Sequence, residues 1–239
     1  MSKDRCHIYF CFKILFLCIV LMLNACIDLS GSRLQERKIK TQFSEVSKQI
    51  INQKSTGKYC GEVHTMRGGL GIFSIGMNQL KESITTTYQV PATSTMWYQS
   101  GEVSRSIAEH YWSQKIHYPI VLIGHSLGAN EQIMVARYLN KVGVPVDLLV
   151  TVDSVSVTRV PPNVRHALNI YKPGFVPMFS GLKLSAMDSN ATYIENVNVN
   201  RLAGMKVNHF TIDKDYRVQE MIMKTVEKVL LYANEKKGA

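Results

Sequence analysis

A serine between two glycines is the residue best placed to do chemistry in this 239-residue chain. Residues 124–128 read Gly-His-Ser-Leu-Gly; an apolar run over 119–123 enters them, and a segment with helical spacing of apolar residues follows. A serine in such a strand–turn–helix has a strained backbone and lies at a helix N-terminus, where the dipole and free amides favour a developing anion. This setting favours nucleophilic attack by the Ser126 hydroxyl. The alternative is that Ser126 only caps the helix.

The pentapeptide resembles the nucleophile elbow of the α/β-hydrolases, in the version found in lipases and thioesterases. In element order the resemblance covers residues 60–235. It implies an acyl-enzyme mechanism and a triad in the chain order serine, acid, histidine. No cofactor is expected, and the scattered histidines and cysteines predict no metal site.

The resemblance places the base after Ser126, where the sequence has His166 and His209. His166 falls inside a predicted strand, a position typical of a core histidine. His209 follows the last predicted strand and precedes the last helix, which is where the family has its base. We therefore assign the base to His209.

For the acid, Asp153 directly follows the apolar strand over 146–152, at the same sheet edge as Ser126. From there a carboxylate can accept from the imidazole and hold its tautomer. In many family members the acid follows the next strand, but here no acidic residue occurs there until Asp188. We assign the acid to Asp153, with Asp188 as the alternative. Asp213 and Asp215 are expected to cap the last helix.

An acyl-transfer site also needs amide donors for the oxyanion. The resemblance implies the N–H of Leu127 as one donor and a donor from the loop after the first strand as the other. That loop reads Arg67-Gly-Gly-Leu-Gly71, and we name Gly68, with Arg67 as the alternative. The glycines could instead only shape a tight turn. They lack the Gly-Lys-Ser of a phosphate-binding loop.

The elements that position these residues alternate along the chain, which predicts a mostly parallel sheet of about six strands with crossover helices on both faces, the α/β-hydrolase fold. Strands are expected over residues 61–66, 84–90, 119–124, 146–152, 164–170 and 192–199. Helices are expected over residues 73–83, 101–115, 127–142 and 215–234. The long loop over 171–191, with Phe175, Met178 and Phe179, is expected to line an acyl pocket or to form a partial lid.

The first 25 residues predict a secretory signal, because a basic head precedes the apolar run over 14–23. The following Leu-Asn-Ala-Cys26 resembles the lipobox of bacterial lipoproteins, which implies lipid attachment at Cys26. An uncleaved anchor over residues 8–27 is the alternative. Both predict an exported, membrane-anchored domain in a bacterial cell envelope, and Ile27 after the cysteine favours the outer membrane.

The formal net charge of +10 would by itself suggest a nucleic-acid binder. However, residues 33–58 hold seven basic and two acidic side chains, whereas the part from 59 onward holds 18 and 14. The basic excess therefore predicts a tether beside anionic lipid over residues 26–58, with an amphipathic helix, and no nucleic-acid partner. The composition of the whole chain, 46% hydrophobic and 19% charged, excludes a disordered protein, and residues 59–239 are expected to form the hydrolase domain.

Together these features predict a membrane-tethered serine hydrolase that cleaves a carboxylic ester or a thioester, of a small molecule or a lipid. A non-catalytic binding lipoprotein on the same scaffold and an acyltransferase with the same triad are the alternatives.

Overall fold

The computed structural model describes residues 59–69, 74–113 and 118–237. Within these residues six parallel strands form one sheet in the order β2-β1-β3-β4-β6-β8. The strands are β1 (Glu62–Arg67), β2 (Ala92–Met96), β3 (Ile120–His125), β4 (Val146–Val152), β6 (Val164–Tyr171) and β8 (Tyr193–Asn198). A separate two-stranded sheet is formed by β5 (Arg159–Val160) and β7 (Ser185–Ala186). The parallel sheet confirms the predicted fold class.

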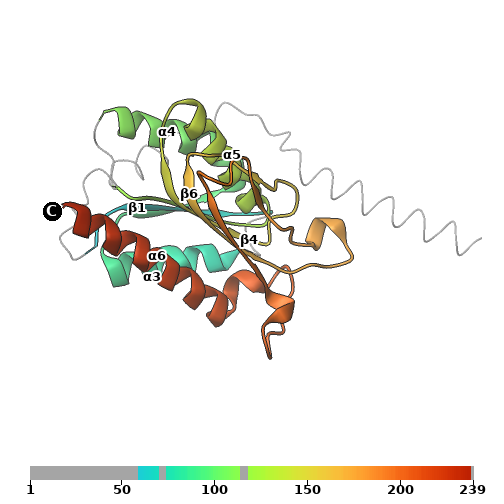
Figure 1. Ribbon diagram of the computed structural model, residues 1–239. Helices are drawn as coiled ribbons and strands as arrows, with labels where there is room; N and C mark the ends of the chain where they lie inside the picture. Colours follow the sequence, from blue (N-terminus) through green and yellow to red (C-terminus); the bar gives the residue numbers. More distant parts are fainter. Residues whose placement is uncertain (1–58, 70–73, 114–117, 238–239) are drawn as a thin grey trace, which may run out of the picture. The chain divides into compact units, whose positions relative to one another are not determined.

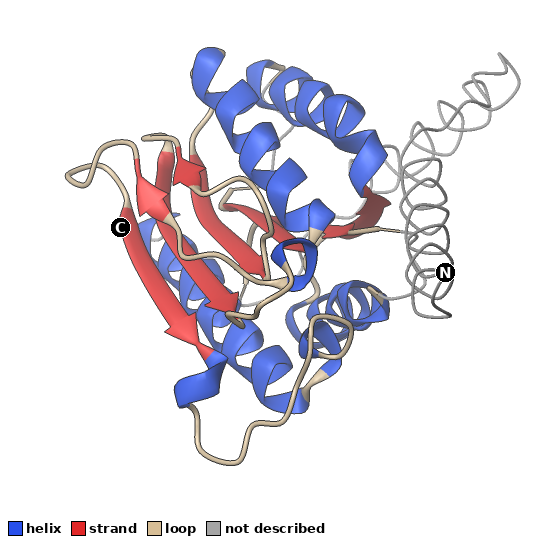
Figure 2. Ribbon diagram, turned by 90° about the vertical axis from the view of Figure 1, so that its right-hand side faces the viewer, coloured by secondary structure: helices blue, strands red, loops and turns tan. Residues whose placement is uncertain are grey.

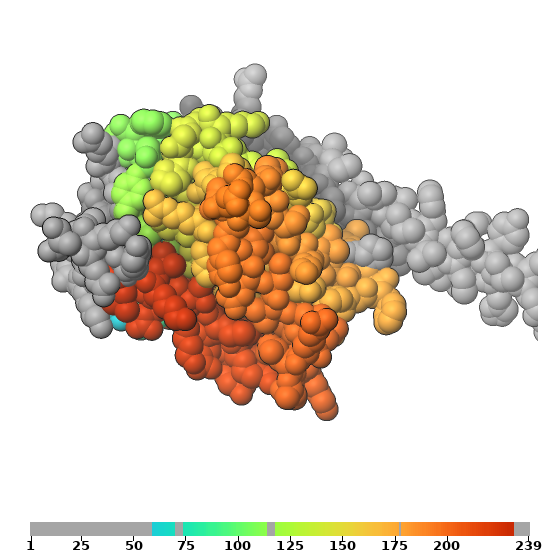
Figure 3. All heavy atoms as spheres, viewed as in Figure 1, coloured from blue at the N-terminus to red at the C-terminus, as the bar shows by residue number. Residues whose placement is uncertain are grey.

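Helices cover both faces of the sheet (Figures 1 and 2). On one face lie α3 (Ile75–Tyr88) and α6 (Tyr216–Lys237); on the other lie α4 (Ser100–Trp112) and α5 (Leu127–Lys141). Short 3-10 turns are η1 (Trp97–Gln99), η2 (Pro177–Phe179), η3 (Val199–Arg201) and η4 (Ile212–Lys214). In the view of Figure 3 the chain from β7 to α6 forms much of the front surface.

The central strands read as nearly continuous apolar runs because they are covered on both sides. Every residue of β3 is buried, and so are six of the seven residues of β4. The core between the sheet and the α3 and α6 layer is made by buried aliphatic side chains that include Val121, Ile123, Leu148, Val150, Leu80, Ile84, Ile222 and Val226. This rigid centre holds the carboxyl ends of the strands, where the predicted site residues lie.

The strand predicted over 84–90 is wrong: this stretch is the end of α3, and strand β2 follows it. The three threonines at 85–87 resemble a strand, yet Thr85 Oγ1 donates to the carbonyl of Lys81 inside the helix. The buried face of α3 continues to Ile84 and Tyr88, so tertiary packing overrides the local β preference. Gln89, with φ of 54°, then ends the helix.

The predicted signal, Cys26 and the tether over 26–58 lie outside the described residues. In the ranges that the structure covers, none of the helices has the length and hydropathy needed to span a membrane. Cys60, the cysteine in those ranges, is a free thiol and half-buried.

Candidate active site

Ser126 occupies the sharp turn between β3 and α5, with φ of 57° and ψ of −123°. Its N–H donates to the carbonyl of Val152 at 2.9 Å, which attaches the turn to β4. A side chain at Gly124 would collide with the carbonyl of Gly128, and one at Gly128 with the carbonyl of Met66. The two glycines therefore let the backbone hold the serine in a conformation that costs about 1–3 kcal/mol in isolation.

The structure brings Ser126, His209 and Asp153 together in one hydrogen-bonded series. His209 Nε2 lies 2.8 Å from Ser126 Oγ, and His209 Nδ1 lies 2.7 Å from Asp153 Oδ2. All three side chains are buried. An ionised carboxylate only accepts, so Nδ1 carries the proton and Nε2 accepts from the serine hydroxyl. This geometry gives the serine a base and the base an orienting group.

Asp153 is fixed from several sides. It has a φ of 54°, and its Oδ1 accepts from the N–H of Lys172 at 2.7 Å. A side chain at Gly181 would collide with that same oxygen. The loop after Asp153 is held by Asn130, whose Oδ1 accepts from Ser154 Oγ at 2.6 Å and from the Val155 N–H at 3.2 Å.

Sequence reasoning did not find Asn130, although it lies in the first turns of α5, four residues after the serine. An asparagine so close to the start of a predicted helix was the available signal. Its partners lie in the loop after β4, so their contact is visible only in the folded chain.

The alternative residues lie elsewhere. Asp188 is in the exposed loop between β7 and β8, where its Oδ1 accepts from the N–H of Asn190. His166 lies in β6, with Nε2 3.9 Å from Glu195 Oε2. Neither joins the series around Ser126.

The histidine inside the elbow, His125, connects three parts of the site. Burial, followed by the neighbouring charge of His209, lowers the pKa of His125 to about 3, so the ring is neutral at ordinary pH. Its Nε2 lies 2.9 Å from the carbonyl of His209 and must donate to it, so Nδ1 accepts from Ser74 Oγ at 2.8 Å. Ser74 Oγ in turn accepts from the N–H of Gly68 at 3.1 Å.

This series changes the role of Gly68. The N–H of Gly68, expected to face the oxyanion, instead donates to Ser74, because the chain turns inward toward the start of α3. The N–H of Leu127, at the first position of α5, has no partner within its own helix and stays a candidate donor. Arg67, the alternative, ends β1 opposite Met96 of β2.

Gly68 also keeps space open beside the elbow, which leads to a prediction. A Cβ at position 68 would lie 2.9 Å from both Leu127 N and Ser126 Cβ. We expect the methyl group of Gly68→Ala to displace the Leu127 N–H. The kcat on a short-chain ester should then fall by about 10²–10³-fold, as it does when an oxyanion contact is lost. The matched control is Gly101→Ala, where the added methyl meets only ordinary contacts and kcat should not change. Equal kcat for both variants, with both folded by circular dichroism, would contradict this role.

The expected cap by Asp213 is also corrected. Its carboxylate caps α3 instead of α6: Oδ2 accepts from the N–H of Gly76 at 2.8 Å. The cap of α6 comes from Asp215, whose Oδ1 accepts from the N–H of Arg217. The η4 turn causes the difference, because it directs Asp213 inward before the last helix begins.

The buried carboxyl of Asp213 predicts a pH dependence of stability. Its side chain is inaccessible, and within the described ranges Oδ1 has no hydrogen-bond partner. Burial raises the pKa of Asp213 from 3.8 to about 6, so between these values the folded protein binds a proton that the unfolded chain releases. The associated stability is present below pH 4 and is lost as the pH rises through 6, a change of about 3 kcal/mol.

Asp213→Asn should remove this dependence. Measured by urea unfolding, the free-energy difference between variant and wild type should move in favour of the variant by about 2–3 kcal/mol from pH 4 to pH 7. Asp215→Asn, at a less buried site, serves as the control. Parallel curves for Asp213→Asn and wild type would show that this carboxyl does not titrate in that range.

The described residues include no group of three or more His, Cys, Asp or Glu side chains arranged to hold a metal ion.

No protein-family model matches the sequence, and no curated protein matches it. Among solved structures, an esterase from the archaeon Pyrobaculum calidifontis is similar over 90% of this chain and 98% of its own, with 11% identity and a TM-score of 0.44. The RedJ thioesterase of prodiginine biosynthesis in Streptomyces coelicolor covers 70% of this chain and 90% of its own (11% identity, TM-score 0.41). The type II thioesterase BorB of the borrelidin cluster covers 72% and 97% (9% identity, TM-score 0.40).

One fold can serve many reactions, so the activity depends on the residues of the site. What this chain itself supplies is the parallel sheet order and the strand–elbow–helix around Ser126. These features give it an α/β-hydrolase fold.

Proposed function

We propose that this protein is a serine hydrolase that cleaves a carboxylic ester or a thioester through an acyl-enzyme. The observation that carries the proposal is the buried series from Ser126 through His209 to Asp153, set at a strained turn before a helix N-terminus. A serine that only capped the helix would need neither a base at 2.8 Å nor a carboxylate behind that base.

In the proposed reaction His209 Nε2 takes the hydroxyl proton while Ser126 Oγ bonds to the acyl carbon. The oxyanion develops beside the N–H of Leu127, and Asp153 stabilises the imidazolium. Collapse of the intermediate breaks the bond to the alcohol or thiol, which leaves with the proton from His209. Water then attacks the acyl carbon with His209 again as base; the bond to Ser126 Oγ breaks, His209 returns the proton to that oxygen, and the carboxylic acid is released.

The proposal includes tethering to a membrane by the N-terminal segment. Its support is the residue pattern described above, namely the basic head, the apolar run and the lipobox-like residues before Cys26.

The experiment that tests the proposal is labelling by a fluorophosphonate probe, which reacts with an activated serine. The wild-type chain should be labelled and Ser126→Ala should not. Ser156→Ala changes an exposed serine in the loop after β4 and should be labelled like the wild type. Equal labelling of Ser126→Ala and wild type, or none of either, would overturn the proposal. A panel of p-nitrophenyl esters of increasing acyl length would then define the substrate.

A further inference from the structure

The loop after β6, residues 173–180, presents apolar side chains to solvent. Phe175, which was expected to line an acyl pocket, is instead fully exposed and lines none, and Val176 and Met178 are 56% and 59% exposed. The base of the loop is closed, because Gly181 N–H donates to the Lys172 carbonyl at 2.9 Å. The tip of the loop, which carries these apolar side chains, therefore projects from a fixed base. In Figure 1 the ribbon of this loop extends beyond the carboxyl edge of the sheet. Neighbouring exposed apolar side chains of this kind commonly mark an interaction site.

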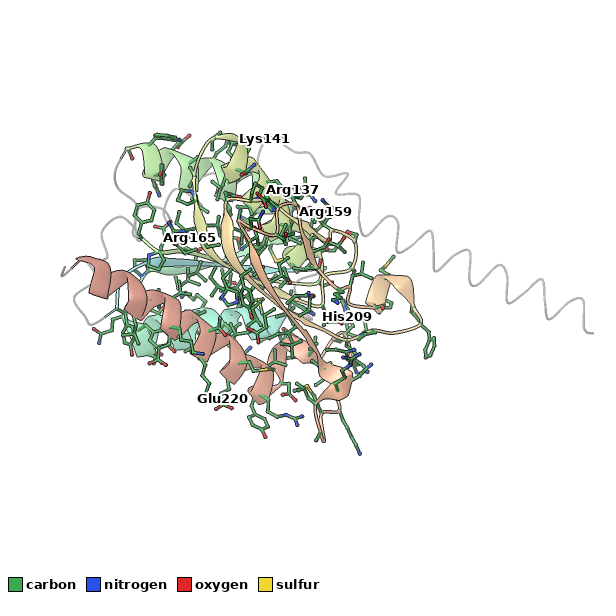
Figure 4. The ribbon with its side chains drawn as sticks, in the orientation of Figure 1. Arg137, Lys141, Arg159, Arg165, His209 and Glu220 are labelled. Carbon is green, nitrogen blue, oxygen red and sulfur yellow. The ribbon has the colours of Figure 1, made fainter. Side chains whose placement is uncertain are left out.

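The same loop borders the proposed active site. The ring of Phe179, at its inner end, lies 5.5 Å from the ring of His209 and 5.1 Å from that of Phe210. His209 lies near the base of the loop in Figure 4. A surface that binds the loop tip therefore lies next to His209, whose Nε2 faces Ser126 Oγ.

The charges at this edge are basic. Segments that follow β6 and β8 contribute Lys172, Arg201, Lys206 and Lys214. The carboxylates of the same segments are withdrawn: Asp213 is buried and Asp215 is paired with Arg217. Strands β6 and β8 are parallel neighbours, so these basic side chains lie at the same edge of the sheet as the apolar tip, and we call them the basic rim.

Exposed apolar residues near the start of β8 have a different setting. Met187 and Tyr193 are also exposed, but Asp188 and Glu195 accompany them. An apolar tip combined with a basic rim is the pattern that binds lipid headgroups and acyl chains together. A surface that bound through apolar contact alone would not need the rim.

We infer that the edge of the sheet around Ser126 docks on an anionic lipid surface, with Phe175, Val176 and Met178 inserted among the acyl chains and the basic rim at the headgroups. Docking rests on the loop and its charges; its consequence, that the substrate is an ester drawn from the lipid phase, rests on the proposed function.

Insertion can be measured with the full chain. An N-terminal anchor would hold the chain on vesicles regardless of the loop, so the informative quantity is the depth of the loop and not total binding. We would introduce Phe175→Trp and measure its quenching by phosphatidylcholine with brominated acyl chains, with and without phosphatidylglycerol. The matched control is Tyr193→Trp, at an exposed site at the start of β8.

The expected result is strong quenching of the added tryptophan at position 175 in vesicles with phosphatidylglycerol, weak quenching without it, and none at position 193. Lys206→Gln and Lys214→Gln should each lower the insertion equilibrium about fivefold, equivalent to about 1 kcal/mol. Lys228→Gln, on α6, should leave it unchanged. Equal quenching in the two vesicle types would contradict anionic recognition. No quenching at position 175 in either would overturn docking and favour a protein partner for the loop.

An activity measurement separates this inference from the proposed function. Phe175→Ser/Val176→Ser should lower hydrolysis of a vesicle-held ester by about tenfold or more and leave hydrolysis of a water-soluble ester unchanged. Met187→Ser/Tyr193→Ser should change neither rate. Equal rates for the loop variant and wild type on the vesicle-held ester would count against docking. Quenching at position 175 without hydrolysis of any ester by wild type would support docking and overturn the proposed function.

Discussion

Replacing His209 by glutamine is expected to lower kcat on a short-chain ester by about 10⁴-fold or more. Nε2 of His209 accepts from Ser126 Oγ at 2.8 Å, and the described chain offers no other base in contact with that oxygen. Without the imidazole, the serine must lose its proton to water, and the leaving group has no positioned acid. The fluorophosphonate labelling rate should fall with kcat, because it depends on the same activated oxygen.

The matched control for this prediction is His166→Gln. His166 is the other histidine after the elbow, half-buried in β6 and away from the serine. Its replacement should leave kcat within about twofold of wild type, since it changes a partly exposed contact with Glu195. Comparable losses for His166→Gln and His209→Gln would point to loss of folding, and unchanged kcat in His209→Gln would remove the base from the mechanism.

The parts of the site that sequence reasoning located are those set by local pattern or by sheet topology. Ser126 is identified by its two glycines and by the apolar strand before it. Asp153 directly follows a buried strand, and the carboxyl ends of parallel strands share one edge, so its position follows from the order of elements. The assignment of His209 rested on the resemblance to the α/β-hydrolases, in which the base precedes the last helix.

The parts that were missed depend on contacts between distant segments. Asn130 and Gly181 fix the acid, yet their partners lie 24 and 28 residues away in sequence. Asp213 pairs with Gly76 across 137 residues, and nothing near Asp213 distinguishes this from a cap of the next helix. The hydrogen bond of the Gly68 N–H was also missed, because its acceptor Ser74 is oriented by His125 from another strand.

The helix boundary in α3 was missed for a different reason. Threonines favour strands in general, so residues 85–87 indicated a strand where the structure has the last turn of a helix. The helix is stabilised over these residues by burial of Ile84 and Tyr88 in the core shared with α6. The Tyr88 hydroxyl donates to the carbonyl of Met223 in α6. Local preference of this size is readily outweighed by such packing.

Replacing Asp153 by asparagine is expected to lower kcat by about 10⁴-fold with little change in the fold. Oδ1 of Asp153 accepts from the Lys172 N–H at 2.7 Å, and Oδ2 accepts from His209 Nδ1 at 2.7 Å. The matched variant is Asp188→Asn, which removes the alternative carboxylate and should leave kcat unchanged. A large loss in Asp188→Asn together with near-normal kcat in Asp153→Asn would reverse the assignment of the acid.

The geometry around Asp153 explains why one atom should have so large an effect. The Lys172 N–H requires an acceptor, so the amide oxygen of asparagine must take the Oδ1 position and its NH₂ group must face His209. Gly181 packs against the same oxygen and leaves no room for the side chain to shift. Nδ1 of His209 then has to accept, which moves the ring proton to Nε2 and directs an N–H at Ser126 Oγ. The base would thus be present at its normal distance but in the tautomer that cannot take the serine proton. The loss should therefore appear in kcat and in probe labelling, while urea unfolding of Asp153→Asn stays close to that of wild type.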